Sequence, residues 1–310
     1  SPPPRMVPAG IVLKSKVSTD DDPHLPELAI KMYTCGSLAG TYKICVQPSG
    51  QVDTAEPVVG IPGADAQIID QLKLWRFSAL PKAACFLQQL EFQLPRPEQS
   101  CLFTGPPLVP QDWMADAKLS TGDYPQLPAG QAAPPGCDPL IGVYKLCTNR
   151  DGSVLPPTVV RGLASLDQVA IDALSRWRYR PIGAPVCTWQ YIRFPEKLPE
   201  LCPGSAAEEI PPQAKGADEE QTKSAFIARQ QRISGDDPHL PDVIKALNRG
   251  RVLTGAYKIC TAHNGTVSSI DPIRSLLRAD EAVMQTMVLW RYKPAPRQIC
   301  YKQFLEFHIE

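Results

Sequence analysis

Apolar and polar residues along this chain form three similar successions of short alternating runs, each with one helical run. In the third succession, residues 257–260 alternate between side chains suited to a core and side chains suited to water, the period-two pattern of a β-strand. A second extended run follows a short polar break in each succession. The breaks contain Ser49-Gly50, Asp151-Gly152 and Asn264-Gly265. Such dipeptides between extended runs indicate β-hairpins.

An amphipathic helix is expected after each hairpin. In the first succession Ile68, Ile69, Leu72 and Trp75 share one helical face. An aspartate suited to the first helical turn stands 10 residues before each equivalent tryptophan, at Asp65, Asp167 and Asp280. A proline soon after the tryptophan bars any continuation of the helix. A further strand should therefore follow.

These closing strands are expected at residues 85–94, 187–194 and 300–309. A helix-linked return to the same sheet favours a right-handed crossover, with the first strand between the other two. The closing strand would then be an edge. Shorter helices are expected at residues 27–33 and 242–248, after proline-flanked openings. The second copy, rich in Ala, Pro and Gly over residues 128–136, is expected to lack this helix.

The three successions share one spacing. In each, Tyr-Lys-(Ile or Leu)-Cys is followed 30 residues after its cysteine by Trp-Arg-(Phe or Tyr), and 40 residues after it by a second cysteine. This repetition predicts an α+β protein of three tandem domains, each a three-stranded antiparallel sheet packed on one or two helices. The domains would span residues 21–102, 122–203 and 235–310, after an N-terminal segment of residues 1–20. Residues 103–121 and 204–234, rich in proline and small polar residues, are expected to be linkers.

The ten cysteines follow the repeat. Six are the pairs already described, while Cys35 and Cys137 each lie 10 residues before the first of their pair. The third repeat lacks both this position and the one matching Cys101 and Cys202, a joint absence that bonded pairs predict. We expect Cys45–Cys85, Cys147–Cys187, Cys260–Cys300, Cys35–Cys101 and Cys137–Cys202. The alternative, a zinc or thiol site, is disfavoured because no C-x-x-C occurs. Disulfides imply an oxidising compartment.

Composition excludes several classes of function. Lys plus Arg equals Asp plus Glu, at 32 each, so no net charge favours nucleic acid or an anionic membrane. No run approaches the roughly 18 apolar residues of a spanning helix. The sequence contains no serine elbow, phosphate loop or H-E-x-x-H motif, and its four histidines share no partner. We therefore expect no enzyme activity, no cofactor and no metal.

The repeated aromatic and basic residues have two readings each. Trp75, Trp177 and Trp290 are expected to be core anchors rather than ligand-stacking surfaces. The arginine after each tryptophan is expected to cap a carbonyl or form a local ion pair; the alternative is to grip a carboxylate of a partner. The acidic runs before Pro23 and Pro238 lack the ligand spacing of calcium loops and favour capping.

The order of these elements resembles the C-terminal domain of TonB energy transducers. The resemblance covers about 75 residues in each copy. The third copy carries it most fully, in Pro238-His239-Leu240-Pro241, Gly255-Ala256-Tyr257-Lys258, Asn264-Gly265-Thr266-Val267 and Trp290-Arg291-Tyr292-Lys293-Pro294. It implies a non-catalytic periplasmic domain of a Gram-negative bacterium that binds a partner segment on the edge of its closing strand, such as the TonB box of an outer-membrane receptor.

The outward-facing residues of the closing strands are the candidate binding residues. They are Leu87, Gln89, Glu91, Trp189, Tyr191, Arg193, Lys302, Phe304 and Glu306. The apolar ones among them could instead shelter a disulfide or pack against a neighbouring repeat.

TonB proteins usually carry one such domain behind a membrane helix, whereas this chain has three copies and no such helix in its sequence. A cell-envelope interaction protein is therefore expected. The alternatives are the soluble part of a TonB-type energy transducer and a structural spacer without a peptide ligand. The sequence does not identify the partner, the binding domain, the oligomeric state or an upstream anchor.

Overall fold

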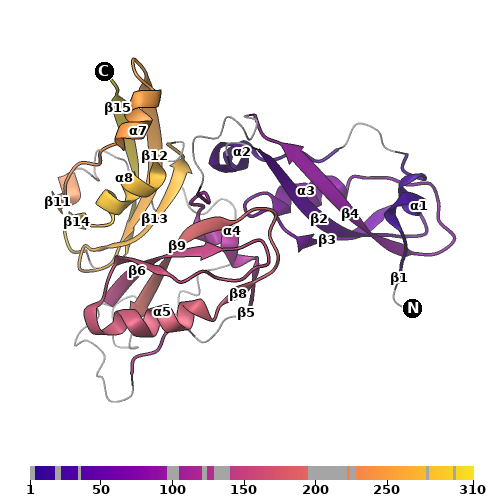
Figure 1. Cartoon of the computed structure of the whole chain (residues 1–310), viewed down its shortest axis with the longest axis horizontal. Coiled ribbons are helices and arrows are strands. Elements are labelled where there is room, and N and C mark those ends of the chain that lie inside the picture. Colours follow the sequence, from indigo (N-terminus) through magenta and orange to yellow (C-terminus); the bar gives the residue numbers. More distant parts are fainter. Residues whose placement is uncertain are drawn as a thin grey trace.

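The computed structural model shows three lobes in chain order, each built around a small β-sheet (Figure 1). It describes residues 4–17, 22–33, 36–95, 105–120, 124–128, 140–194, 222–223, 228, 230–276, 279–295 and 298–310. The expected mixed α+β class is confirmed: helices and small, mainly antiparallel sheets alternate along the chain. No helix in these ranges is long and apolar enough to cross a membrane.

The first repeat sets the pattern. Its elements are α2 (Glu27–Tyr33), β2 (Ser37–Val46), β3 (Val52–Val59), α3 (Asp65–Leu72) and β4 (Ala84–Gln93). β2 lies between β3 and β4 and pairs antiparallel with both, as the crossover argument predicts. Ile68 and Leu72 on α3 are fully buried against this sheet. The apolar helical stripe read from the sequence is therefore the face that α3 presents to the core.

The other two repeats follow the same order. The second contains β6 (Leu140–Thr148), β7 (Thr158–Arg161), a short 3-10 helix (Ala164–Leu166), α5 (Asp167–Ser175), β8 (Arg178–Tyr179) and β9 (Val186–Phe194). The third contains α7 (Asp242–Leu247), β12 (Val252–Thr261), β13 (Val267–Arg274), α8 (Asp280–Met287), β14 (Arg291–Tyr292) and β15 (Ile299–His308). The helix expected to be missing from the second repeat falls on residues outside the described ranges.

Three of the expected disulfides are present, at the same place in each sheet. Cys45–Cys85, Cys147–Cys187 and Cys260–Cys300 join residues that lie directly opposite each other on neighbouring strands. Their Cα atoms are 4.0, 3.9 and 4.0 Å apart. This spacing is that of a non-hydrogen-bonded antiparallel pair. The other two expected bonds lie outside the described residues.

Segments expected to be linkers are instead folded onto the repeat that follows them. Residues 103–121 include α4 (Gln111–Ala115) and β5 (Lys118–Ser120), which pairs with β8. Residues 204–234 include β10 (Thr222–Lys223), parallel to β15, and β11 (Arg232–Ser234), which pairs with β14. In the N-terminal segment, β1 (Arg5–Met6) runs parallel to β4, and α1 (Ala9–Leu13) follows it. Each repeat is thus larger than its expected domain.

These leading segments complete the core of each repeat. Trp75, Trp177 and Trp290 are only 3, 2 and 2% exposed. A cation from the leading segment lies over each ring: Lys16 Nζ at 3.8 Å from the Trp75 centroid, Lys118 Nζ at 3.1 Å from that of Trp177, and Arg232 Cζ at 4.3 Å from that of Trp290. The leading segment therefore covers the tryptophan that the repeat itself leaves open on one side.

The hairpin turns depend on glycine for two reasons. Gly50, Gly152 and Gly265 have φ values of 85, 83 and 80°, in the left-handed region. A Cβ on Gly152 would also stand 1.8 Å from the carbonyl oxygen of Tyr179. The turn packs directly on the backbone of β8, which leaves no room for a side chain.

We expect Gly152→Ala to lower the free energy of unfolding by about 2 kcal/mol or more, because it adds backbone strain to a backbone collision. Gly10→Ala is the matched control, since its Cβ meets nothing within 4 Å. Urea titration followed by tryptophan fluorescence measures both variants. Equal stability of the two would contradict the argument.

Candidate strand-pairing site

The disulfides determine which backbone groups of the closing strands point outward. In an antiparallel pair, residues of a non-hydrogen-bonded pair direct N–H and C=O away from each other. Cys85 and every second residue after it therefore face away from β2, and the N–H of Val7 indeed donates to the Cys85 carbonyl at 2.9 Å. The same parity applies to Cys187 in β9 and Cys300 in β15. Leu87, Gln89, Glu91, Lys302, Phe304 and Glu306 thus combine outward side chains with outward backbone groups.

Only the beginning of each closing strand has a partner on its outer side. β1 covers Ala84 and Cys85, and β10 covers Cys300 and Tyr301. Beyond these positions, no described strand pairs with the outer side of β4 or β15. Both strands retain an open edge that is several residues long.

The closing strand of the second repeat is different, because β9 is covered. Its first residues meet Leu108, and the N–H of Arg193 donates to the Tyr124 hydroxyl at 2.7 Å. Trp189 and Tyr191, candidate binding residues from the sequence, are 2 and 8% exposed and pack in a hydrophobic cluster with the third repeat. The structure therefore places them in an internal junction and not on an accessible edge.

Tyr191 also covers an edge of the third repeat. Its hydroxyl accepts a hydrogen bond from the N–H of Ile270 at 2.9 Å and donates to the carbonyl of the same residue at 3.4 Å. Arg161 donates to the carbonyls of Val267 and Val288, each at 2.9 Å. Across the same junction, Lys145 pairs with Glu281 at 2.7 Å. These contacts occupy the outer side of β13 and the end of α8.

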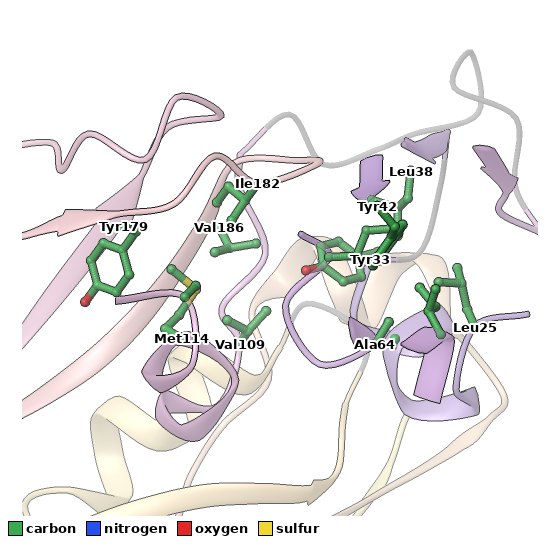
Figure 2. Packing of buried hydrophobic residues seen from close by; sticks show 14 of the residues in the cluster. Leu25, Tyr33, Leu38, Tyr42, Ala64, Val109, Met114, Tyr179, Ile182 and Val186 are labelled. Atoms are coloured by element: carbon green, nitrogen blue, oxygen red, sulfur yellow. The ribbon is translucent and has the colours of Figure 1, made fainter. Parts of the chain in front are cut away.

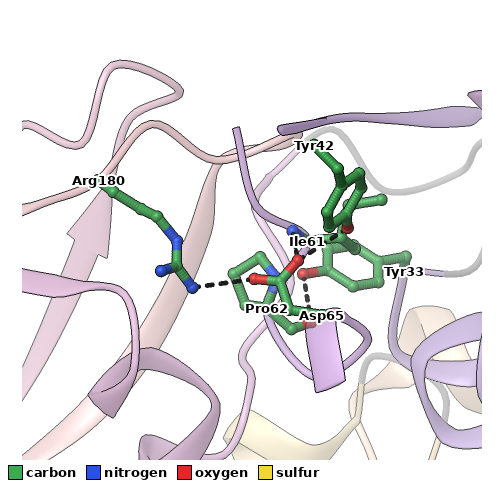
Figure 3. A network of polar contacts seen from close by, with 6 residues as sticks. All are labelled: Tyr33, Tyr42, Ile61, Pro62, Asp65 and Arg180. Carbon is green, nitrogen blue, oxygen red and sulfur yellow. Dashed lines mark hydrogen bonds and ion pairs between the residues drawn. The ribbon is translucent and has the colours of Figure 1, made fainter. Parts of the chain in front are cut away.

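The first and second repeats join at the start of α3 (Figure 3). The Asp65 carboxylate accepts hydrogen bonds from the N–H of Ile61 at 2.7 Å and the hydroxyl of Tyr42 at 2.8 Å, and it pairs with Arg180 of the second repeat at 3.1 Å. Burial raises the pKa of Asp65, against the opposing effects of these hydrogen bonds and of Arg180. The loops beside it exchange backbone hydrogen bonds between Gly60, Pro181 and Gly183.

The tyrosine–aspartate contact is common to all three repeats, but the arginine is not. Tyr144 donates to Asp167 at 2.8 Å and Tyr257 to Asp280 at 2.6 Å. The expected helix-start aspartates therefore bind a strand tyrosine and a preceding backbone N–H. Around the Asp65 junction, a hydrophobic cluster continues from Leu25 and Tyr33 of the first repeat to Ile182 and Val186 of the second (Figure 2).

The two outer strands of the first and third sheets differ in how they resist pairing. β3 carries Pro57 opposite Tyr42, and β13 carries Pro272 opposite Tyr257. Proline has no N–H to donate, and natural sheets use it to block edges. The closing strands β4 and β15 contain no proline. Their edges lack this block, although Glu91, Lys302 and Glu306 place charges along them.

A glutamine that the sequence analysis did not single out lies at the open edges. It stands at the third position after the closing cysteine in every repeat, as Gln88, Gln190 and Gln303. The side-chain amide of Gln88 donates to the Gln89 carbonyl at 2.7 Å, and that of Gln303 to the Phe304 carbonyl at 2.9 Å. Both carbonyls point outward, so the glutamine partly satisfies the edge while it is empty. The recurrence in register was the signal in the sequence.

An open groove of about 880 Å³ runs beside the edge of β15. Residues of β15 from Gln303 to Phe307 line one side, and Trp290 and Tyr292 contribute aromatic surface. Phe304, on the outward face, is 54% exposed, and its counterpart in β4, Leu87, is 46% exposed. The edge of β15 therefore combines free backbone groups with apolar surface.

The other motifs have structural roles. Arg76 donates to the carbonyls of Lys73, Leu74 and Trp75, and Arg178 to those of Ser175 and Trp177, so both cap their own helix. Within the described ranges, no group of three His, Cys, Asp or Glu side chains is placed to hold a metal. Comparisons with protein-family models, curated protein sequences and solved structures find no match to this chain.

We expect Asp65 and Arg180 to be energetically coupled, because both side chains are largely buried and each loses its charged partner when the other is replaced. A double-mutant cycle of Asp65→Asn and Arg180→Gln should give a coupling of about 1 kcal/mol or more in urea unfolding. The control cycle replaces Arg180→Gln with Arg178→Gln, whose side chain caps its own helix. A coupling as small as that of the control would show that the ion pair does not join the repeats.

Proposed function

We propose that this chain is a non-catalytic interaction protein of an oxidising cell-envelope compartment, the periplasm of a Gram-negative bacterium, and that it binds extended partner segments at the outer edges of β4 and β15. The carrying observation is the open edge of β15 from Lys302 to His308, which lies beside the groove. The three disulfides support an exported location. The resemblance to TonB C-terminal domains supports the same binding mode.

Backbone pairing suits this edge energetically. Lys302, Phe304, Glu306 and His308 each direct an N–H and a C=O outward. A typical hydrogen bond contributes about 0.5–1.5 kcal/mol net. A segment paired along these residues would thus gain several kcal/mol from the backbone before any side-chain contact. This is the β-augmentation mode, in which the backbone supplies affinity and alternate side chains supply selectivity.

The second repeat has a structural role in this proposal. The edge of β9 is met by Leu108 and Tyr124, and its side chains are buried on both faces. These observations favour the spacer function for this repeat alone. It would hold the first and third repeats, and with them the two open edges, in one assembly.

Proline at an outward position tests the proposal directly, because it removes an outward N–H without removing a bond to the central strand. We expect Glu306→Pro to weaken binding at β15 at least tenfold, and Glu91→Pro to do the same at β4. The probes are blocked octapeptides in which threonine alternates with valine, methionine or alanine, and binding is followed by amide shifts in NMR spectra. Glu306→Ala and Glu91→Ala are the matched controls, since they lose the same carboxylate but keep the N–H.

The spacer alternative gives a different result for the whole chain. If no probe shifts the amides of β4 or β15, and these amides are as protected from hydrogen exchange as those of β9, the open-edge function is wrong.

A further inference from the structure

The groove beside β15 has a specific origin in the leading segment of the third repeat. The cation over each tryptophan identifies equivalent positions: Lys16, Lys118 and Arg232. Four residues before these cations stand Val12, Met114 and Ala228. The first two repeats therefore place a larger aliphatic side chain where the third has only a methyl group.

Those larger side chains fill core space in their own repeats. Val12 and Met114 are 3 and 2% exposed and belong to the hydrophobic cluster of the first two repeats. Figure 2 shows Met114 near Tyr179 of β8 and Val186 at the start of β9. Ala228 lines the groove together with Tyr292, the counterpart of Tyr179. The third repeat thus leaves open a place beside its closing strand that the others fill from within.

A polar atom at the groove also lacks a partner. Tyr292 lines the groove, and its hydroxyl is buried without a hydrogen bond among the described residues. Tyr292 itself is 1% exposed. A buried hydroxyl without a partner is costly, and a ligand atom that reaches it would remove this cost.

We propose that the groove accepts an aliphatic side chain of about methionine size from the segment that pairs with β15. The inference rests on the proposed function and names what the third repeat selects. The chain itself shows the occupant, because Met114 takes the equivalent position in the second repeat. The groove is continuous with the open edge through Gln303, Leu305 and Phe307. Side chains on one face of a paired segment project toward that side of the sheet. Its volume lies within the usual range of about 300–1,000 Å³ for binding pockets.

Filling the groove from within tests whether the space exists. We expect Ala228→Met to raise the melting temperature of the full chain by a few degrees, because the new side chain gains contacts without displacing others. Met114→Ala in the second repeat should lower the melting temperature, because it opens a cavity in a filled core. A lower melting temperature for Ala228→Met would mean that the space is already occupied, and this would overturn the inference.

Peptide selectivity tests the occupant. The threonine–methionine octapeptide should bind β15 about tenfold more tightly than the threonine–alanine octapeptide, and Ala228→Met should reduce this preference to about twofold or less. Glu91→Pro in both backgrounds removes the contribution of β4. If both octapeptides shift the β15 amides with equal affinity, the groove inference fails while edge pairing stands. If neither shifts them, the proposed pairing at β15 fails as well, even where Ala228→Met is stabilising.

Discussion

The cross-strand disulfide is the constraint on which the architecture of each repeat depends. A one-residue shift between two strands would turn every side chain to the opposite face of the sheet. The bond between directly opposed cysteines excludes such a shift in all three sheets. It holds the apolar face against the helix, and it also determines which N–H and C=O groups of the closing strand remain available. Core packing and exposed edge chemistry therefore follow from one covalent link.

The three repeats differ in what happens at their edges. The second repeat is enclosed by its neighbours, and its contacts satisfy polar groups that would otherwise be exposed: Tyr191 binds the backbone of Ile270, and Arg180 binds Asp65. The first and third repeats keep open closing strands, while proline blocks the opposite edge strand of each. A repeated fold has thus been specialised mainly through its contacts, with little change in its frame.

Local sequence signals predicted most of the frame. The glycine turns, helix-start aspartates, proline stops and cysteine spacing each act over a few residues or within one repeat, and the structure places them as such. The leading segments were harder to recognise, because their short strands and helices are held by tertiary contacts. The recurrence of Val-Pro eight residues before a lysine, at Pro8 and Pro110, was the available clue. The junction of the second and third repeats had a clue as well: β9 is apolar or aromatic at positions of both faces, a pattern of strands buried on two sides.

The leading segments also bear on the order in which the chain can fold. Each repeat is completed by residues that precede it, and its disulfide joins cysteines 40 residues apart within it. As the chain emerges from its N-terminus, every partner needed to finish a repeat is present once its closing strand appears. A repeat completed by the segment after it would have to wait with its tryptophan uncovered. Here each unit can close and oxidise before the next one is delivered, which limits mispairing between cysteines of similar repeats.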